Sequence, residues 1–243
     1  MWSGGTKRRP AAYWLSQRCV ARRLAGGALD LVATESVDQG LDQLKDWLAK
    51  SSGRNGQLWL GGALCQLVTV PAMKGVSALQ EAEAVAKLEQ QAKGALLEGF
   101  DFKLHECSPD AAQWRATLTD RRLMGAEVNL WQRKLASMKP WWSWALAQGS
   151  TEGAGRPRIV LASDGETLTE LIRDGEGRVT LGQTQGVPGG QDAQRRQLLR
   201  RQAVAGDAML TGVSMNFEAE RNIDSSARSD QTFPFAPWVE VHP

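Results

Sequence analysis

The chain has 243 residues, of which 42% are hydrophobic, so it can bury one large core or two smaller ones. Its formal net charge of +2 gives no general attraction to nucleic acid or to an anionic membrane. No apolar run approaches the roughly 20 residues that a membrane-spanning helix needs. The three cysteines lie far apart and no apolar signal segment opens the chain, so we expect reduced thiols in a cytosolic protein.

The first elements in the chain are three expected strands, a helix and a fourth strand. The strands are predicted over Ala11–Ser16, Arg18–Ala25, Ala28–Ala33 and Gln57–Gly61. The helix follows the third strand, because Ser36 is a good N-cap and Gln39 stands three residues later, as in a capping box. Its expected apolar face carries Val37, Leu41, Leu44, Trp47 and Leu48.

The middle of the sequence, roughly 64–149, predicts an α+β insertion. A helix opens at Ser77, and two strands follow over Phe100–Glu106 and Gln113–Thr119. A second helix is predicted over about Arg121–Met138. Pro140 then suits the first turn of a short tryptophan-rich helix.

The C-terminal third repeats the order of the N-terminal elements. Three expected strands, Arg158–Ser163, Thr167–Arg173 and Arg178–Thr184, are joined by Asp-Gly turns, which favour tight hairpins because these residues tolerate positive φ. A helix is predicted from Asp192 to about residue 205, and Ala208–Ser214 is typical of a strand. The sequence therefore contains two β-β-β-α-β units.

Four stretches carry a family resemblance together with this duplicated order. They are Q-L-W-L-G-G-A-L-C-Q-L-V-T-V-P-A, E-A-E-A-V-A, A-T-L-T-D-R-R-L-M-G-A-E-V-N-L-W and L-A-S-D-G-E-T-L-T-E-L. The chain resembles the actin-like ATPase superfamily, in particular PilM of type IV pili and the cytoplasmic part of GspL of type II secretion. This resemblance implies an α/β fold with two ribonuclease-H-like halves, each a mixed sheet flanked by helices, around the α+β insertion.

The expected organisation has five parts. A flexible N-terminus covers 1–10, the first actin-like half 11–63, the inserted subdomain 64–149, the second actin-like half 150–217 and a flexible tail 218–243. The tail is predicted to be flexible because its first part is polar and low in bulky apolar residues.

The turn Ser163–Thr167 is the candidate phosphate loop. The resemblance implies an Asp-x-Gly loop followed by Thr or Ser in each half, where glycine admits phosphate oxygens to backbone N–H groups and the carboxylate holds the cation. Asp164, Gly165 and Thr167 match this pattern in part, whereas Leu15–Cys19 in the first half lacks both the acid and the glycine. We therefore expect a structural hairpin, no catalytic residue, and no resident cofactor or metal.

Two other groups of residues are candidates for chemistry. The short cluster around His105 supplies too few ligands for a metal site, so a half-buried strand histidine is expected. A basic stripe on the second-half helix favours a solvated face or an acidic protein partner over nucleic acid, because no aromatic residues are interleaved with it. The stripe consists of Arg195, Arg196, Arg200 and Arg201.

Tryptophan is abundant, with 10 residues against a single tyrosine. Trp141, Trp142 and Trp144 follow a proline, and a short helix cannot bury three indoles in one direction. Tryptophan is enriched in interface hot spots because it buries a large area and keeps an N–H donor. These residues are therefore predicted either to contact a protein partner or to pack between the insertion and the second half.

The end of the tail is a second candidate for partner binding. Phe233, Phe235 and Trp238 lie in an extended, proline-spaced segment after the polar linker. Aromatic anchors on a linker suit docking, either onto the chain's own domain or onto another chain.

Two functions follow as hypotheses. The first is a non-catalytic actin-like scaffold that binds protein partners in a bacterial envelope assembly, such as a type IV pilus or a type II secretion-like machine. The resemblance implies that such a chain is cytoplasmic and reaches the inner membrane through a membrane-protein partner. The alternative is a switch or ATPase that binds ATP and Mg²⁺ through Asp164, Gly165 and Thr167.

Overall fold

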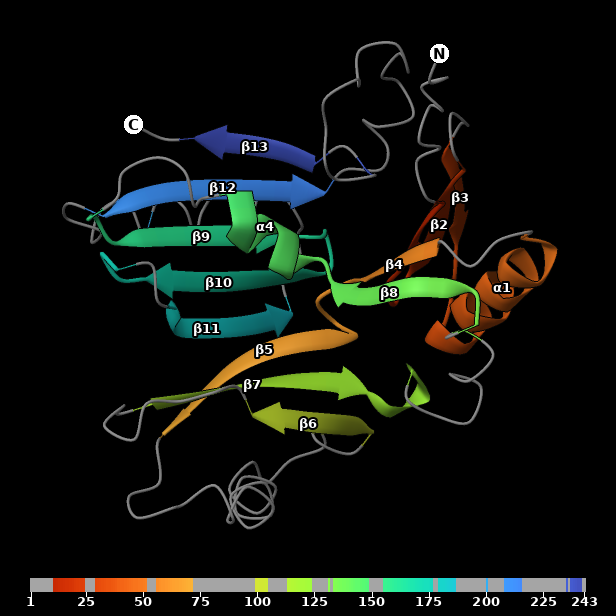
Figure 1. Ribbon diagram of the computed structural model, residues 1–243, viewed down its shortest axis with the longest axis horizontal. Coiled ribbons are helices and arrows are strands. Elements are labelled where there is room, and N and C mark those ends of the chain that lie inside the picture. The colour runs from red at the N-terminus through yellow and green to blue at the C-terminus, as the bar shows by residue number, and fades with distance from the viewer. Residues whose placement is uncertain are drawn as a thin grey trace, which may run out of the picture.

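The structure, a computed structural model, describes residues 11–24, 29–51, 56–71, 99–104, 113–123, 131, 133–148, 155–176, 179–186, 200, 208–215, 235 and 237–241. These residues form two five-stranded mixed sheets and one three-stranded sheet (Figure 1). The two large sheets share one strand order, which confirms the expected duplicated α/β fold.

The first large sheet has the order β3-β2-β1-β4-β8. Its strands are β1 (Ala12–Leu15), β2 (Cys19–Arg23), β3 (Leu29–Ala33), β4 (Gly56–Leu60) and β8 (Leu135–Pro140). The first three pair antiparallel, while β4 runs parallel to β1 and β8 runs parallel to β4. This sheet, with the helix that covers it, is called the first half below.

Helix α1 (Val37–Lys50) covers one face of the first half. The Ser36 hydroxyl accepts the Gln39 N–H at 3.3 Å, and the Gln39 side chain accepts the N–H of Glu35 at 2.8 Å, so the predicted cap is confirmed. The apolar face packs on Tyr13 and Leu15 of β1, whose side chains point to the same side of the pleated sheet. All five predicted core positions of this helix are buried: Val37, Leu41, Leu44, Trp47 and Leu48.

The second large sheet, called the second half, has the order β11-β10-β9-β12-β13. Its strands are β9 (Arg158–Ser163), β10 (Thr167–Arg173), β11 (Val179–Gly186), β12 (Met209–Met215) and β13 (Pro237–Val241). As in the first half, the fourth strand is parallel to the first. The fifth strand differs, because β13 pairs antiparallel with β12.

The small sheet has the order β5-β7-β6 and is antiparallel throughout. It consists of β5 (Cys65–Pro71), β6 (Phe100–Leu104) and β7 (Gln113–Asp120). β5 lies beside β11 of the second half (Figure 1). There the Leu67 N–H donates to the Thr184 hydroxyl at 2.9 Å. The insertion is thus tied to the second half, and the helix predicted from Ser77 lies outside the described residues.

The helix predicted over Arg121–Met138 is wrong at both of its ends. Arg121–Leu123 is a short 3-10 turn, η2, and Leu135–Pro140 is strand β8. Leu135 and Met138 do pack on the core beneath α1, but they do so from a strand that pairs with β4. Pairing with a distant strand overrides the helical spacing. The predicted insertion boundary of 64–149 is therefore too wide, since β8 belongs to the first half.

A second core lies between the two halves. It contains Trp14 of β1, Trp141 and Trp142 at the start of helix α4 (Trp142–Gln148), Val213 of β12 and Phe235. The predicted tryptophan-rich helix is confirmed as α4. No helix within the described ranges is long and apolar enough to cross a membrane.

Candidate functional site

The turn between β9 and β10 holds the predicted phosphate-loop residues. Gly165 has a φ of +86°, in the left-handed region that favours glycine, which explains the Asp-Gly pair. The Asp164 N–H donates to the Thr167 carbonyl at 3.2 Å, so the turn is closed on itself. Asp164 and Thr167 are only 8% and 5% exposed, which means that these side chains face protein instead of solvent.

Both oxygens of the Asp164 carboxylate accept hydrogen bonds from the protein. Oδ2 accepts the Gly62 N–H at 2.6 Å. Oδ1 accepts the Thr167 N–H at 2.7 Å, the Thr167 hydroxyl at 3.0 Å and the Glu166 N–H at 3.0 Å. Burial raises the pKa of Asp164 above its ordinary value, and these donors oppose the rise. The carboxylate therefore ties its own turn to Gly62, two residues after the end of β4.

Glu166 makes the second contact between the halves. Its Oε1 accepts the Ser16 hydroxyl at 2.6 Å and the Arg18 N–H at 2.9 Å, and its Oε2 accepts the Gln17 N–H at 3.0 Å. Burial raises the pKa of Glu166, and the nearby Asp164 charge adds to this rise. The structure thus brings the candidate phosphate turn Ser163–Thr167 and its first-half counterpart Leu15–Cys19 into direct contact through a carboxylate.

Two glycines permit this close approach. A Cβ on Gly61 would lie 2.8 Å from Ser16 Cβ and 3.1 Å from Asp164 Oδ2. A Cβ on Gly62 would overlap the Thr167 hydroxyl. Backbone of the first half can therefore reach the Asp164 carboxylate only because both positions lack a side chain.

We predict that Gly62→Ala lowers the free energy of unfolding by about 1–3 kcal/mol, because the added methyl group forces the Thr167 side chain away from Asp164. Urea-induced unfolding followed by circular dichroism measures this change. Gly186→Ala is the matched control, since a Cβ there meets no atom within 4 Å and a near-zero effect is expected. Equal losses in the two variants would contradict the crowding at Gly62.

The predicted partner-binding tryptophans lie in and around the core. Trp141 is 0% exposed and Trp142 is 5% exposed, and the Trp142 indole N–H donates to the Cys65 carbonyl at 2.8 Å. Trp144 is partly buried against the same cluster. The sequence left open packing between the insertion and the second half, whereas these residues lie in the core between the two halves. A partner contact for them stays a prediction.

The tail docks on its own chain. Phe235 is 0% exposed and lies edge-on to Trp14, with ring centroids 6.2 Å apart and an interplanar angle of 76°. β13 continues the second sheet, and Trp238 pairs with Ser214 in its register. Phe233 lies outside the described residues.

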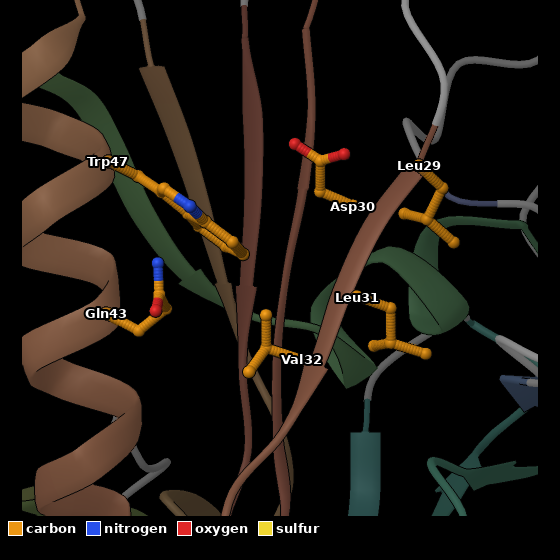
Figure 2. Close-up of a pocket in the computed structure, with 6 residues that line it drawn as sticks. All are labelled: Leu29, Asp30, Leu31, Val32, Gln43 and Trp47. Carbon is orange, nitrogen blue, oxygen red and sulfur yellow. The ribbon is translucent and has the colours of Figure 1, made fainter.

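A shallow pocket of about 470 Å³ lies between α1 and the edge strand β3. Figure 2 shows Trp47 and Gln43 projecting from the helix toward Val32 and Asp30 of the strand. The guanidinium of Arg22 sits 4.8 Å from the Trp47 ring and 2.7 Å from the Asp30 carboxylate. Because the ionisable residue of the lining is already paired, the pocket offers a surface and no evident acid-base chemistry.

The remaining sequence candidates contribute little to the site. Burial raises the pKa of the free thiols Cys19 and Cys65 to about 11, so both are poor nucleophiles at neutral pH. Arg200 is exposed, while the other three arginines of the predicted stripe and the cluster around His105 lie outside the described residues.

The strand order of the two halves, and the turns that meet between them, define an actin-like ATPase fold, as the sequence resemblance implied. A solved protein of unknown function from Bacteroides thetaiotaomicron, with an actin-like ATPase fold, matches with a TM-score of 0.50 at 8% identity, over 84% of this chain and 81% of that chain. No family model and no curated protein matches this chain.

Two other solved structures are similar in fold. The cytoplasmic domain of EpsL, an inner membrane component of the type II secretion system of Vibrio cholerae, has a TM-score of 0.43 at 13% identity, covering 72% of this chain and 70% of that chain. The PilM-PilN type IV pilus biogenesis complex has a TM-score of 0.43 at 14% identity, covering 81% of this chain and 65% of that chain.

Proposed function

We propose that this protein is a non-catalytic adaptor with an actin-like fold, which binds protein partners in a bacterial envelope assembly of the type IV pilus or type II secretion kind. The observation that carries the proposal is the Asp164 carboxylate, which accepts four hydrogen bonds from Gly62, Glu166 and Thr167. A nucleotide loop needs this carboxylate for the cation or its water, and it needs backbone N–H groups for phosphate oxygens.

The residues present do not fit ATP and Mg²⁺. Asp164 is engaged with protein donors, and Glu166 takes the N–H groups of Gln17 and Arg18 in the other turn. Behind these turns, the space between the halves is filled by a tryptophan-rich core that includes Trp14 and Trp141. Admitting a nucleotide would require breaking the contacts of both carboxylates, so a scaffold role is favoured over hydrolysis.

The kind of assembly is taken from the sequence resemblance to PilM and to the cytoplasmic part of GspL. PilM forms a type IV pilus biogenesis complex with PilN, and EpsL is an inner membrane component of a type II secretion system. By extension, we assign this chain a cytoplasmic position, peripheral to the inner membrane, where an inner-membrane protein is its partner.

The nucleotide side of the proposal is tested by calorimetric titration with ATP and Mg²⁺ beside a thermal-shift assay. We expect no heat of binding and no stabilisation beyond that given by Mg²⁺ alone. The assay is sensitive, because a ligand at about 100 times its Kd stabilises a protein by about 2.7 kcal/mol. Binding that Thr167→Val removes would identify the Ser163–Thr167 turn as a phosphate loop and overturn the proposal.

The partner side is tested by crosslinking in native cells followed by affinity capture and mass spectrometry. We expect enrichment of an inner-membrane component of a pilus or secretion assembly over an untagged control, with reconstitution from purified proteins as confirmation. Recovery of abundant cytosolic proteins alone, at the level of the control, would count against an envelope assembly.

A further inference from the structure

The turn between β1 and β2 directs three hydrogen-bond donors at one carboxylate. They are the Ser16 hydroxyl and the backbone N–H groups of Gln17 and Arg18, and all three bind the carboxylate of Glu166. The Ser16 side chain is 1% exposed, so its hydroxyl has little access to water as an alternative acceptor. A buried hydroxyl and two adjacent N–H groups that converge on one anion have the geometry of an anion-binding site.

We propose that the turn Ser16–Arg18 is a carboxylate-binding site, and that Glu166 is its built-in ligand, which latches the second half onto the first. The proposal rests on the adaptor function, which assumes that no nucleotide lies between the halves. It deepens that function, because it explains how the halves stay closed.

The charge and shape of the site favour a carboxylate over a phosphate. Three donors match the two oxygens of Glu166, with two bonds to Oε1 and one to Oε2. The neighbouring Asp164 charge already disfavours ionisation of Glu166, and a phosphate with nearly two charges would be repelled more strongly. The turn also lacks the glycine that would let bulkier phosphate oxygens approach the backbone.

The latch holds two separate points of the first half. Glu166 binds the turn that joins β1 to β2, and Asp164, two residues earlier, binds Gly62 just after β4. β1 and β4 are parallel neighbours, so these points lie at the same edge of the sheet. One hairpin turn of the second half therefore fixes the carboxyl ends of β1 and β4.

The test is chemical rescue of Glu166→Ala. The variant is expected to unfold with an equilibrium constant about tenfold or more above that of the wild type, since it loses charge-assisted hydrogen bonds. Formate should reverse this loss in part: with a Kd of about 20 mM, about 0.2 M formate lowers the unfolding constant roughly tenfold. Sodium chloride at equal ionic strength and pH should give no such recovery, and the wild type should not distinguish formate from chloride.

Two further variants keep the test decisive. Adding Ser16→Ala to Glu166→Ala removes one donor and should weaken the formate effect severalfold. If Glu166→Ala does not fold, Glu166→Gln is used, and it should be destabilised yet indifferent to formate, because its amide fills the site. Equal effects of formate and chloride on Glu166→Ala, selective rescue by inorganic phosphate, or wild-type stability of Glu166→Gln would overturn the proposal. None of these results depends on whether an envelope partner is captured.

Discussion

Replacing Asp164 by alanine is expected to lower the free energy of unfolding by about 3–5 kcal/mol. The substitution leaves the N–H groups of Gly62, Glu166 and Thr167 without their acceptor, at a place where Asp164 itself is only 8% exposed. Each buried donor without a partner costs about 1–3 kcal/mol, and water can recover part of this cost where it gains access. Urea-induced unfolding followed by circular dichroism measures the difference.

The same sheet supplies a matched control. Asp174 occupies the other Asp-Gly turn, between β10 and β11, where it accepts the exposed Glu176 N–H at 3.0 Å. Asp174→Ala should cost less than about 1 kcal/mol, since water replaces the lost acceptor. If both alanine variants lost the same stability, Asp164 would be only a local turn residue and would not join the halves.

The repeated strand order could be predicted because its signals are local. Apolar periodicity placed α1 and its five core residues, and Asp-Gly pairs placed the hairpins of the second half. β8 was missed because its apolar residues also fit a helical spacing, and its strand conformation depends on β4, which lies far away in the sequence. Long-range parallel pairing leaves no short-range mark of the kind that identifies a hairpin.

The candidate site was predictable only in its second-half part. The partial Asp-x-Gly motif located Asp164, but the partners of Glu166 lie 148 to 150 residues away in the chain. One signal was available in the turn Ser163–Thr167. Glu166 is a second acidic residue there, and its charge would repel a phosphate. The pair Gly61-Gly62 was a second signal, because adjacent glycines after a buried strand allow a close backbone approach.

The second large expected effect on stability comes from the core between the two halves. Trp14→Ala should lower the free energy of unfolding by about 3–5 kcal/mol, because it empties a fully buried indole site. The Trp14 ring lies 6.0 Å from that of Trp141 at an angle of 59°, and 6.2 Å from Phe235 at 76°. Trp14 thus joins β1 to the start of α4 and to the tail, and its loss loosens three elements together.

A double-mutant cycle measures how strongly Phe235 of the tail is coupled to Trp14 in this core. Trp14→Ala and Phe235→Ala should couple by about 0.5–1.5 kcal/mol, as buried aromatic pairs do. Trp47→Ala provides the control, since Trp47 packs from α1 onto the first sheet in a different cluster, and its effect should add to that of Phe235→Ala within about 0.5 kcal/mol. Additive effects of Trp14 and Phe235 would contradict tail docking at this site. A coupling that vanished on dilution would instead mean that the tail of one copy docks on another, since only an intermolecular contact depends on protein concentration.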